Sequence, residues 1–162
     1  MVGKYFKNDS FKDFKGVEHK FTVALVIEHI ENAPKNKIRL ATGVSVCCEK
    51  DEWNEETGKM ISANRASAKH PESIYSSALA KSLLTQEVIQ DALTKEADFV
   101  RENPGVFIKG YDQAKKRYLR RQKAEKLWAE MTEEERNLLV KLHENKFSDA
   151  YNEFVKGKFS IL

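Results

Sequence analysis

The stretch "KFTVALVIEHIENAPKNKIRLATGVSV", from Lys20 to Val46, decides the fold, because two alternating runs flank a segment of turn-forming residues. In an extended backbone every second side chain lies on the same face, and a period of two is therefore the pattern of a β-strand. In the first run one face carries Phe21, Val23, Leu25 and Ile27, and the other carries Thr22, Ala24, Val26 and Glu28.

The second run has the same period of two. Between the runs, Pro34 stands between Asn32 and Asn36, and these residue types favour a turn. The two runs are therefore predicted to form an antiparallel hairpin. In the second strand one face holds Ile38, Leu40, Thr42, Val44 and Val46, and the other holds Arg39, Ala41, Gly43 and Ser45.

A two-stranded hairpin is only marginally stable alone, so further structure has to join it or cover it. Two segments are candidates for an added strand, and the first of them could instead form a hooked arm. The segment "KYFKNDSFKDFKG" (residues 4–16) carries three phenylalanines, and the segment "KFSIL" (residues 158–162) lies at the other end of the sequence.

After Cys48 the pattern changes to that of a helix. Asp51 or Asn54 can cap its first turn, and the acidic residues that follow suit the positive end of a helix dipole. We expect Gly58 to let this helix lie close to the sheet. We expect His70-Pro71 to end it, because the residue before a proline avoids the helical conformation. The residues expected on its packing side are Trp53, Thr57, Met60, Ile61 and Asn64.

A longer helix is predicted from about Glu72 to Glu102, with two neighbouring apolar stripes. A second is predicted from Tyr111 to Met131, a third from the capping box Thr132–Glu135 onward, and a short one from Ser148. The two stripes of the longer helix are Leu84, Val88, Ala92 and Phe99, and Ile89, Leu93, Ala97 and Val100. The core positions expected in the next two helices are Ala124, Leu127, Trp128 and Met131, then Leu138, Leu139 and Leu142.

Strands come first in this order and helices afterwards, which indicates the α+β class. We expect an N-terminal antiparallel hairpin or small sheet packed by a helix (residues 1–70). A C-terminal helical region of about four helices (residues 71–162) is expected to be continuous with it as one compact unit.

The composition, 41% hydrophobic and 33% charged over 162 residues, is typical of a soluble, helix-rich globular protein. No apolar run approaches the roughly 20 residues that span a bilayer, and the first residues lack the apolar centre of a secretory signal. We therefore expect an intracellular protein without a membrane partner. The net charge of +3 is too small to indicate nucleic acid by itself.

Two adjacent cysteines, Cys47 and Cys48, stand where the strand pattern ends. Neighbouring strand residues point to opposite faces, so a disulfide between them would be strained. The alternation directs Cys48 to the side of Val44 and Val46, and Cys47 to the other face with Gly43 and Ser45. The carboxylates that follow disfavour a reactive thiolate, and we interpret both cysteines as structural.

No metal or cofactor site is predicted. The acidic run that opens the first helix could bind a divalent cation, but it lacks the spacing of a calcium loop, and a solvated helix start explains it better. The histidines show no paired ligand spacing. The acidic residues are Asp51, Glu52, Glu55 and Glu56, and the histidines are His19, His29, His70 and His143.

The stretch with the most uneven charge is "KGYDQAKKRYLRRQKAEK", residues 109–126, which has eight basic residues and two acidic ones. On a helix such residues can grip phosphates without reading sequence, and Tyr111 and Tyr118 are near enough to stack. The alternatives are a solvated helix face or contact with an acidic surface of a neighbouring subunit. The candidate nucleic-acid-binding residues are Lys115, Lys116, Arg117, Arg120, Arg121 and Lys123.

Enzyme signatures are missing: the sequence has no phosphate-binding glycine loop, no serine-centred elbow and no paired histidines on a helix. We therefore expect a protein without catalytic activity.

Residues 43–66 resemble a pattern found in small proteins of tailed bacteriophages and prophages. It reads Gly43-Val-Ser-Val-Cys47, Asp51-Glu-Trp53-Asn-Glu, Gly58-Lys and Asn64-Arg65-Ala66. This chain differs in having Cys48 and Glu49 where a proline is usual, and Trp53 where phenylalanine is commoner. The resemblance implies a phage origin, Trp53 and Gly58 as packing residues, and Arg65 as a surface or pairing residue.

Two functional hypotheses follow. The first is a structural or assembly component of a phage particle, such as an auxiliary, connector or head-associated subunit. It would contact copies of itself or other phage subunits, in the host cytoplasm and then in the virion. The alternative is a phage nucleic-acid-binding or regulatory module that uses residues 109–126 for non-specific phosphate contacts.

Overall fold

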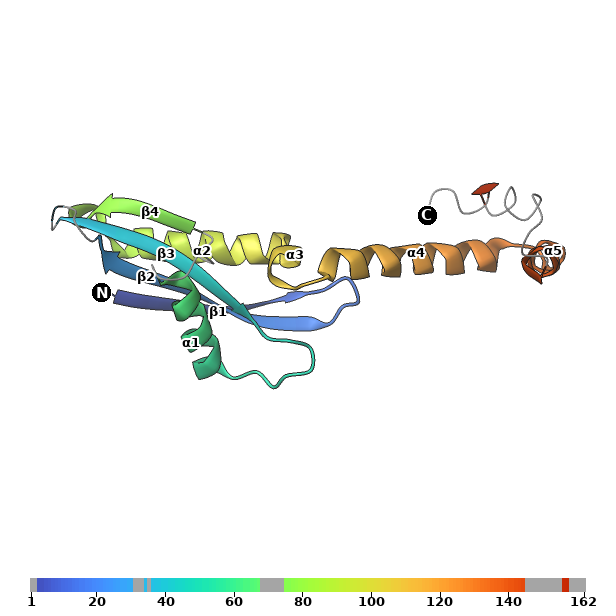
Figure 1. The fold of residues 1–162 in the computed structure, drawn as a ribbon, viewed down its shortest axis with the longest axis horizontal. Coiled ribbons are helices and arrows are strands. Elements are labelled where there is room, and N and C mark those ends of the chain that lie inside the picture. The colour runs from blue at the N-terminus through green and yellow to red at the C-terminus, as the bar shows by residue number, and fades with distance from the viewer. Residues whose placement is uncertain (1–2, 31–33, 35, 68–74, 145–155, 158–162) are drawn as a thin grey trace. The chain divides into compact units, whose positions relative to one another are not determined.

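The computed structural model describes residues 3–30, 34, 36–67, 75–144 and 156–157. The chain divides into two compact units, Met1–Lys109 and Gly110–Leu162 (Figure 1). The first unit contains β1 (Gly3–Lys12), β2 (Glu18–His29), β3 (Lys37–Val46), α1 (Glu55–Ala66), β4 (Tyr75–Ala80), the short 3₁₀-helix η1 (Lys81–Leu83), α2 (Gln86–Glu102) and α3 (Pro104–Phe107). The second contains α4 (Tyr111–Glu130) and α5 (Glu133–Glu144).

The strands form one antiparallel sheet in the order β1-β2-β3-β4. The predicted hairpin is confirmed as β2 and β3, in a register that pairs Phe21 with Val46. The N-terminal segment supplies the third strand, β1, which pairs Lys12 with Glu18 across a tight connection. The predicted α+β class, with an N-terminal sheet and helices after it, is confirmed.

The fourth strand corrects the sequence analysis. A helix was expected from about Glu72, but residues 75–80 pair with β3, with Ala80 opposite Lys37, and α2 begins only at Gln86. The alanines and serines here suit a helix, but the open edge of β3 needs hydrogen-bond partners, and tertiary pairing overrides local preference. The expected boundary at residue 70 lies inside the first unit, Met1–Lys109.

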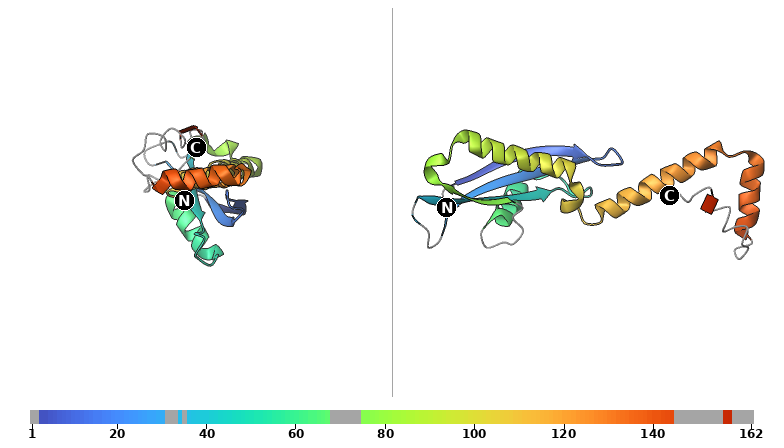
Figure 2. Two further views of the ribbon diagram at one scale, coloured as in Figure 1. Left: turned by 90° about the vertical axis from the view of Figure 1, so that its right-hand side faces the viewer. Right: turned by 90° about the horizontal axis from the view of Figure 1, so that it is seen from above.

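Helices α1 and α2 lie on opposite faces of the sheet (Figure 2). Strand β2 is central, and all its residues from Phe21 to Ile27 are buried. A strand covered on both faces has no side chain directed to solvent along that length. The core of the first unit is therefore organised around β2.

The face toward α2 carries the large side chains of the hairpin. Against it, α2 buries one of its two predicted stripes, while Val88, Ala92 and Phe99 of the other stripe stay partly exposed. The helix starts at Thr85, whose hydroxyl accepts a hydrogen bond from the Val88 amide (3.2 Å). The buried apolar residues of α2 are Ile89, Leu93, Ala97 and Val100.

The face toward α1 carries small side chains, and the residues of α1 that pack against it are small as well. The expected packing side is wrong, because Met60 and Ile61 are 59% and 36% exposed. An interface of small residues lets the helix backbone approach the sheet, whereas large side chains would hold it away. The buried residues of α1 are Gly58, Ser62, Ala63 and Ala66.

The approach is closest at Gly43, in the middle of β3. A methyl group added there would overlap the carbonyl oxygen of Ser62 and lie 2.5 Å from the amide nitrogen of Ala66. Both are backbone atoms, which cannot rotate away as a side chain can. Glycine at this position therefore sets the distance between α1 and the sheet. Gly58 is also close to the sheet, beside Thr22, as expected.

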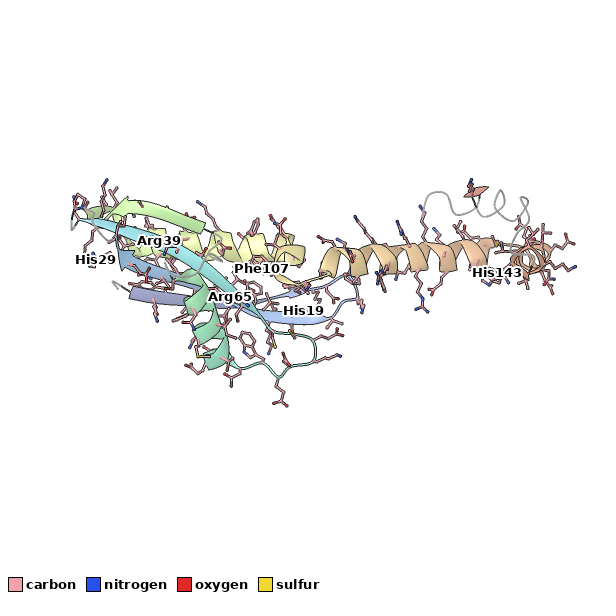
Figure 3. All side chains as sticks on the ribbon, in the orientation of Figure 1. His19, His29, Arg39, Arg65, Phe107 and His143 are labelled. Atoms are coloured by element: carbon pink, nitrogen blue, oxygen red, sulfur yellow. The ribbon has the colours of Figure 1, made fainter. Side chains whose placement is uncertain are left out.

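Hydrogen bonds fix both ends of α1. Asn54 caps the first turn by accepting from the Thr57 amide (2.8 Å). At the other end, Arg65 Nη1 donates to the Val44 carbonyl (2.7 Å), and Arg39 Nη1, which also pairs with Glu28 on β2, donates to the Ala66 carbonyl (3.5 Å) (Figure 3). Arg65 is thus a pairing residue between helix and sheet. The helix ends at Ala66, with Ser67 already extended, before the expected end at His70-Pro71, which lies outside the described residues.

In the second unit, the predicted capping box is confirmed. Thr132 Oγ1 accepts from the Glu135 amide (3.2 Å), and Glu135 Oε2 accepts from the Thr132 amide (3.0 Å). Arg136 donates to the Trp128 carbonyl (2.9 Å) and lies over the indole ring, which ties α5 to the end of α4. The expected helix from Ser148 and the expected strand of residues 158–162 lie outside the described residues.

Of the core positions expected in the second unit, Met131 is buried, whereas Trp128 and Leu138 are exposed. The remaining expected positions, Ala124, Leu127, Leu139 and Leu142, are half-buried.

Replacing Gly43 with alanine tests the contact between α1 and β3. We expect the free energy of unfolding to fall by about 3 kcal/mol or more, because the added methyl overlaps backbone atoms. Urea unfolding followed by circular dichroism measures it. Gly157→Ala is the matched control, with nothing within 4 Å of the added carbon. Equal stability of the two variants would contradict the close contact.

Candidate functional site

The basic segment of α4, residues 115–123, lies inside one continuous helix, so a single element positions all the predicted nucleic-acid-binding residues. Residues three and four apart share a side of a helix, which groups Lys116, Arg120 and Lys123. All six candidates are exposed: Lys115, Lys116, Arg117, Arg120, Arg121 and Lys123.

Few carboxylates neutralise this segment. Arg121 pairs with Glu125 at 2.8 Å, one turn away. Within the part of the chain that the structure describes, the side chains of Lys115, Lys116, Arg117 and Arg120 make no hydrogen bond or ion pair. Their charge is therefore available to an anionic partner.

The tyrosines do not add a stacking surface. Tyr111 is buried, with 9% of its surface exposed, so its expected role in stacking is wrong. Tyr118 is half-buried, and its hydroxyl accepts a hydrogen bond from Gln122 Nε2 (2.7 Å). What the basic segment offers a partner is charge rather than aromatic area.

The cysteine pair stands just beyond β3, which ends at Val46. Cys47 is half-buried, and its thiol donates to the Asp51 carbonyl (3.4 Å). Burial raises the pKa of the Cys47 thiol, and the nearby Asp51 raises it further, which disfavours the reactive thiolate as expected. The alternation that was to direct Cys48 toward the apolar side ends with the strand, and Cys48 is exposed.

The acidic residues in the first turn of α1 form ion pairs within the helix. Lys59 pairs with Glu55 (2.8 Å) and Glu56 (3.2 Å). Among the described residues, no three histidine, cysteine, aspartate or glutamate side chains are placed to hold a metal ion. In the same part of the chain, no helix is both long and apolar enough to cross a bilayer.

The sequence analysis missed a buried carboxyl group at Glu96 of α2, which is only 6% exposed. Its Oε2 accepts a hydrogen bond from the Thr42 hydroxyl (2.8 Å), while its Oε1 has no hydrogen-bond partner among the described residues. Burial raises the pKa of this carboxyl, and the Thr42 hydrogen bond offsets only part of the rise. The available signal was spacing, because Glu96 lies three positions from both Leu93 and Phe99.

A cavity of about 450 Å³ lies beside this carboxyl, between α2 and the β3–β4 edge of the sheet. Most of its wall is apolar, and it includes the partly exposed stripe of α2. The lining residues are Leu40, Ser77, Leu79, Val88, Asp91, Ala92, Lys95, Glu96 and Phe99.

A second buried polar cluster holds the connection between β1 and β2. Asp13 Oδ1 accepts from the amides of Lys15 (2.8 Å) and Val17 (3.0 Å), and Oδ2 contacts His19 Nε2 (3.1 Å). The His19 ring stacks on Phe11, with centroids 5.2 Å apart. Burial raises the pKa of Asp13, but the bonds from His19, Val17 and Lys15 outweigh it, so the net pKa is lowered. These contacts stabilise the turn between β1 and β2.

Comparison with known proteins gives no relative: no family model matches the chain, and neither the curated proteins nor the solved structures contain a significant match.

The lowered pKa of Asp13 makes stability depend on pH. The ionised carboxylate stabilises the fold above the pKa of the unfolded state, and this contribution disappears as the pH falls through the lower folded-state pKa. Asp13→Asn should therefore be destabilising at neutral pH and much less so in acid. Urea unfolding of both proteins across the acid range measures the difference, with Asp112→Asn on the exposed surface of α4 as control. A difference that is constant with pH would contradict this role.

Proposed function

We propose that this protein works by binding rather than by catalysis, and that it binds nucleic acid through phosphate contacts made by the basic segment of α4. The observation that carries the proposal is the set of exposed cations at Lys115, Lys116, Arg117 and Arg120, which have no partner among the described residues. Such a helix attracts a polyanion and releases the counterions condensed on it.

The composition of α4 supports this choice over a helix that packs against another protein. A packing helix carries a wide apolar stripe, whereas Tyr111 is the one buried residue of α4. Contacts with phosphates position a protein on nucleic acid without reading its sequence. The proposal is therefore for non-specific binding, in which single strands and duplexes compete for the same side chains.

The triple variant Lys116→Glu, Arg117→Glu and Arg120→Glu tests this role. For the natural protein we expect binding to a random duplex that weakens steeply with salt, since each neutralised phosphate contributes about 0.9 to the slope of log K against log salt concentration. The variant should lose the binding, or reduce the slope by about 3. Fluorescence anisotropy with a labelled duplex and a labelled single strand measures both quantities.

The matched control reverses three exposed lysines of the first unit, Lys37, Lys50 and Lys81, and changes the net charge equally. It should keep most of the affinity. If both triple variants lose binding to the same extent, general charge attraction explains it, and the role of the basic segment is refuted. Absence of binding by the natural protein at low salt would refute the proposal outright.

A second candidate function is assembly within a phage particle through contacts between proteins, as the resemblance of residues 43–66 implies. The observation that favours it is a group of large apolar side chains exposed on both helices of the second unit. These are Leu119 and Trp128 on α4, and Leu138 and Val140 on α5. Exposed apolar side chains on a helix surface can be buried by contact with another protein.

Light scattering after size-exclusion chromatography tests the assembly function. We expect an oligomer that dissociates in the variant Leu119→Ser, Leu138→Ser and Val140→Ser, because the substitutions remove apolar area from the contact. Mass spectrometry of purified particles would then find the protein among the particle subunits. A monomer at high concentration that is also absent from the particles would exclude this function.

A further inference from the structure

The cavity between α2 and the β3–β4 edge serves neither of these functions, and its size is that of a ligand site. Its volume of about 450 Å³ lies within the range of roughly 300–1,000 Å³ that is usual for pockets of small molecules. Such pockets combine mostly apolar walls with a few convergent polar groups.

The walls of this cavity are mostly apolar. Leu40 and Leu79 come from the sheet, and Val88, Ala92 and Phe99 come from the partly exposed stripe of α2. The Phe99 ring is held in place by an edge-to-face contact with Phe107, whose centroid lies 6.1 Å away. An apolar ligand body would bury these side chains from water.

The polar group that gives the cavity its chemistry is Glu96. Its carboxyl group is buried, Oε2 is bound by Thr42, and Oε1 has no hydrogen-bond partner among the described residues. A buried polar atom without a partner is unfavourable, and a donor supplied by a ligand would remove that penalty. The described residues therefore keep an acceptor beside an apolar cavity and supply no donor to it.

The charges around the cavity select the kind of donor. The other ionisable side chains that line it, Asp91 and Lys95, form an ion pair with each other at 2.7 Å and cancel. An ionised Glu96 thus leaves one uncompensated negative charge. The aromatic face of Phe99 also favours a cation over an anion.

We propose that this cavity is a binding site for small organic amines, in which an apolar body lies against Leu40, Val88 and Phe99 and the ammonium group donates to Glu96 Oε1. The ammonium supplies both the missing hydrogen-bond donor and the missing positive charge. Charge-assisted hydrogen bonds of this kind are stronger than neutral ones.

Binding of an amine at this site is also coupled to the protonation of Glu96. Burial raises the pKa of Glu96 in the free protein, and an ammonium group beside it lowers that pKa by favouring the ionised form. At a pH where Glu96 of the free protein is partly protonated, binding therefore releases protons, and the affinity for an amine rises with pH until this carboxyl is fully ionised.

Titration calorimetry with phenethylamine tests the proposal, with 2-phenylethanol as a neutral ligand of nearly the same shape. We expect phenethylamine to bind the natural protein at least about tenfold more tightly than the alcohol, as a charged hydrogen bond implies. Titrations in two buffers of different ionisation enthalpy should show proton release. No binding of phenethylamine at millimolar concentration, or equal affinity for the two ligands, would overturn the proposal.

Two variants locate the ligand. Glu96→Gln keeps the shape of the side chain and should abolish the preference for the amine together with the proton release. Glu87→Gln, the matched control on the same helix, lies on the exposed surface outside the cavity lining and should keep both. If Glu96→Gln does not fold, Ala92→Leu, which fills the cavity and leaves Glu96 in place, should block both ligands. Retention of the preference for the amine by a folded Glu96→Gln, or of amine binding by Ala92→Leu, would show that the amine binds elsewhere.

Discussion

At Gly43 the backbone of α1 lies directly against β3, close enough that a single methyl group would overlap the carbonyl of Ser62. This contact is available because the facing side of the sheet is built from small residues such as Ala24, and because α1 turns Ala63 and Ala66 toward it. Once the helix is so close, Arg65 can reach the Val44 carbonyl. The connection through residues 47–54 then follows from the position of the helix.

The opposite face of the sheet packs against its helix in a different way. Large side chains such as Phe21, Leu25 and Ile27 project toward α2, so this helix packs through side chains rather than backbone. Packing of that kind follows the shape of the residues at hand, and beside β4 it leaves the cavity lined by Glu96. Thr42, the polar position in an otherwise apolar row, binds one oxygen of that carboxyl. The difference in side-chain size between the two faces thus accounts for one helix that packs through its backbone and one that packs through its side chains.

Period-two alternation was enough to predict β2, β3, their pairing and the residues on each face, because one face packs large side chains against α2 and the other packs smaller ones against α1. Local preference could not predict β4, since residues 75–80 suit a helix and become a strand only through the free edge of β3. The packing side of α1 was wrong for a related reason. Apolar size was taken to mark the inside, whereas the contact at Gly43 selects small residues and leaves Met60 exposed.

The candidate sites also differ in how far the sequence alone could predict them. The basic segment was visible in composition, and the structure adds that its residues share one helix and that Tyr111 is buried. Glu96 could not be singled out, because an acidic residue in a charged helix is exposed by default, and its burial depends on Thr42, more than fifty positions earlier.

The central claim is that the first unit is organised around β2, fixed between a close helix on one face and a side-chain layer on the other. Native-state hydrogen exchange tests it most directly. Amides of β2 from Phe21 to Ile27 should exchange only through global unfolding, with the same free energy that urea unfolding gives, whereas amides in the middle of α4 should exchange through much smaller openings. Exchange of the β2 amides through local openings as frequent as those of α4 would contradict the account.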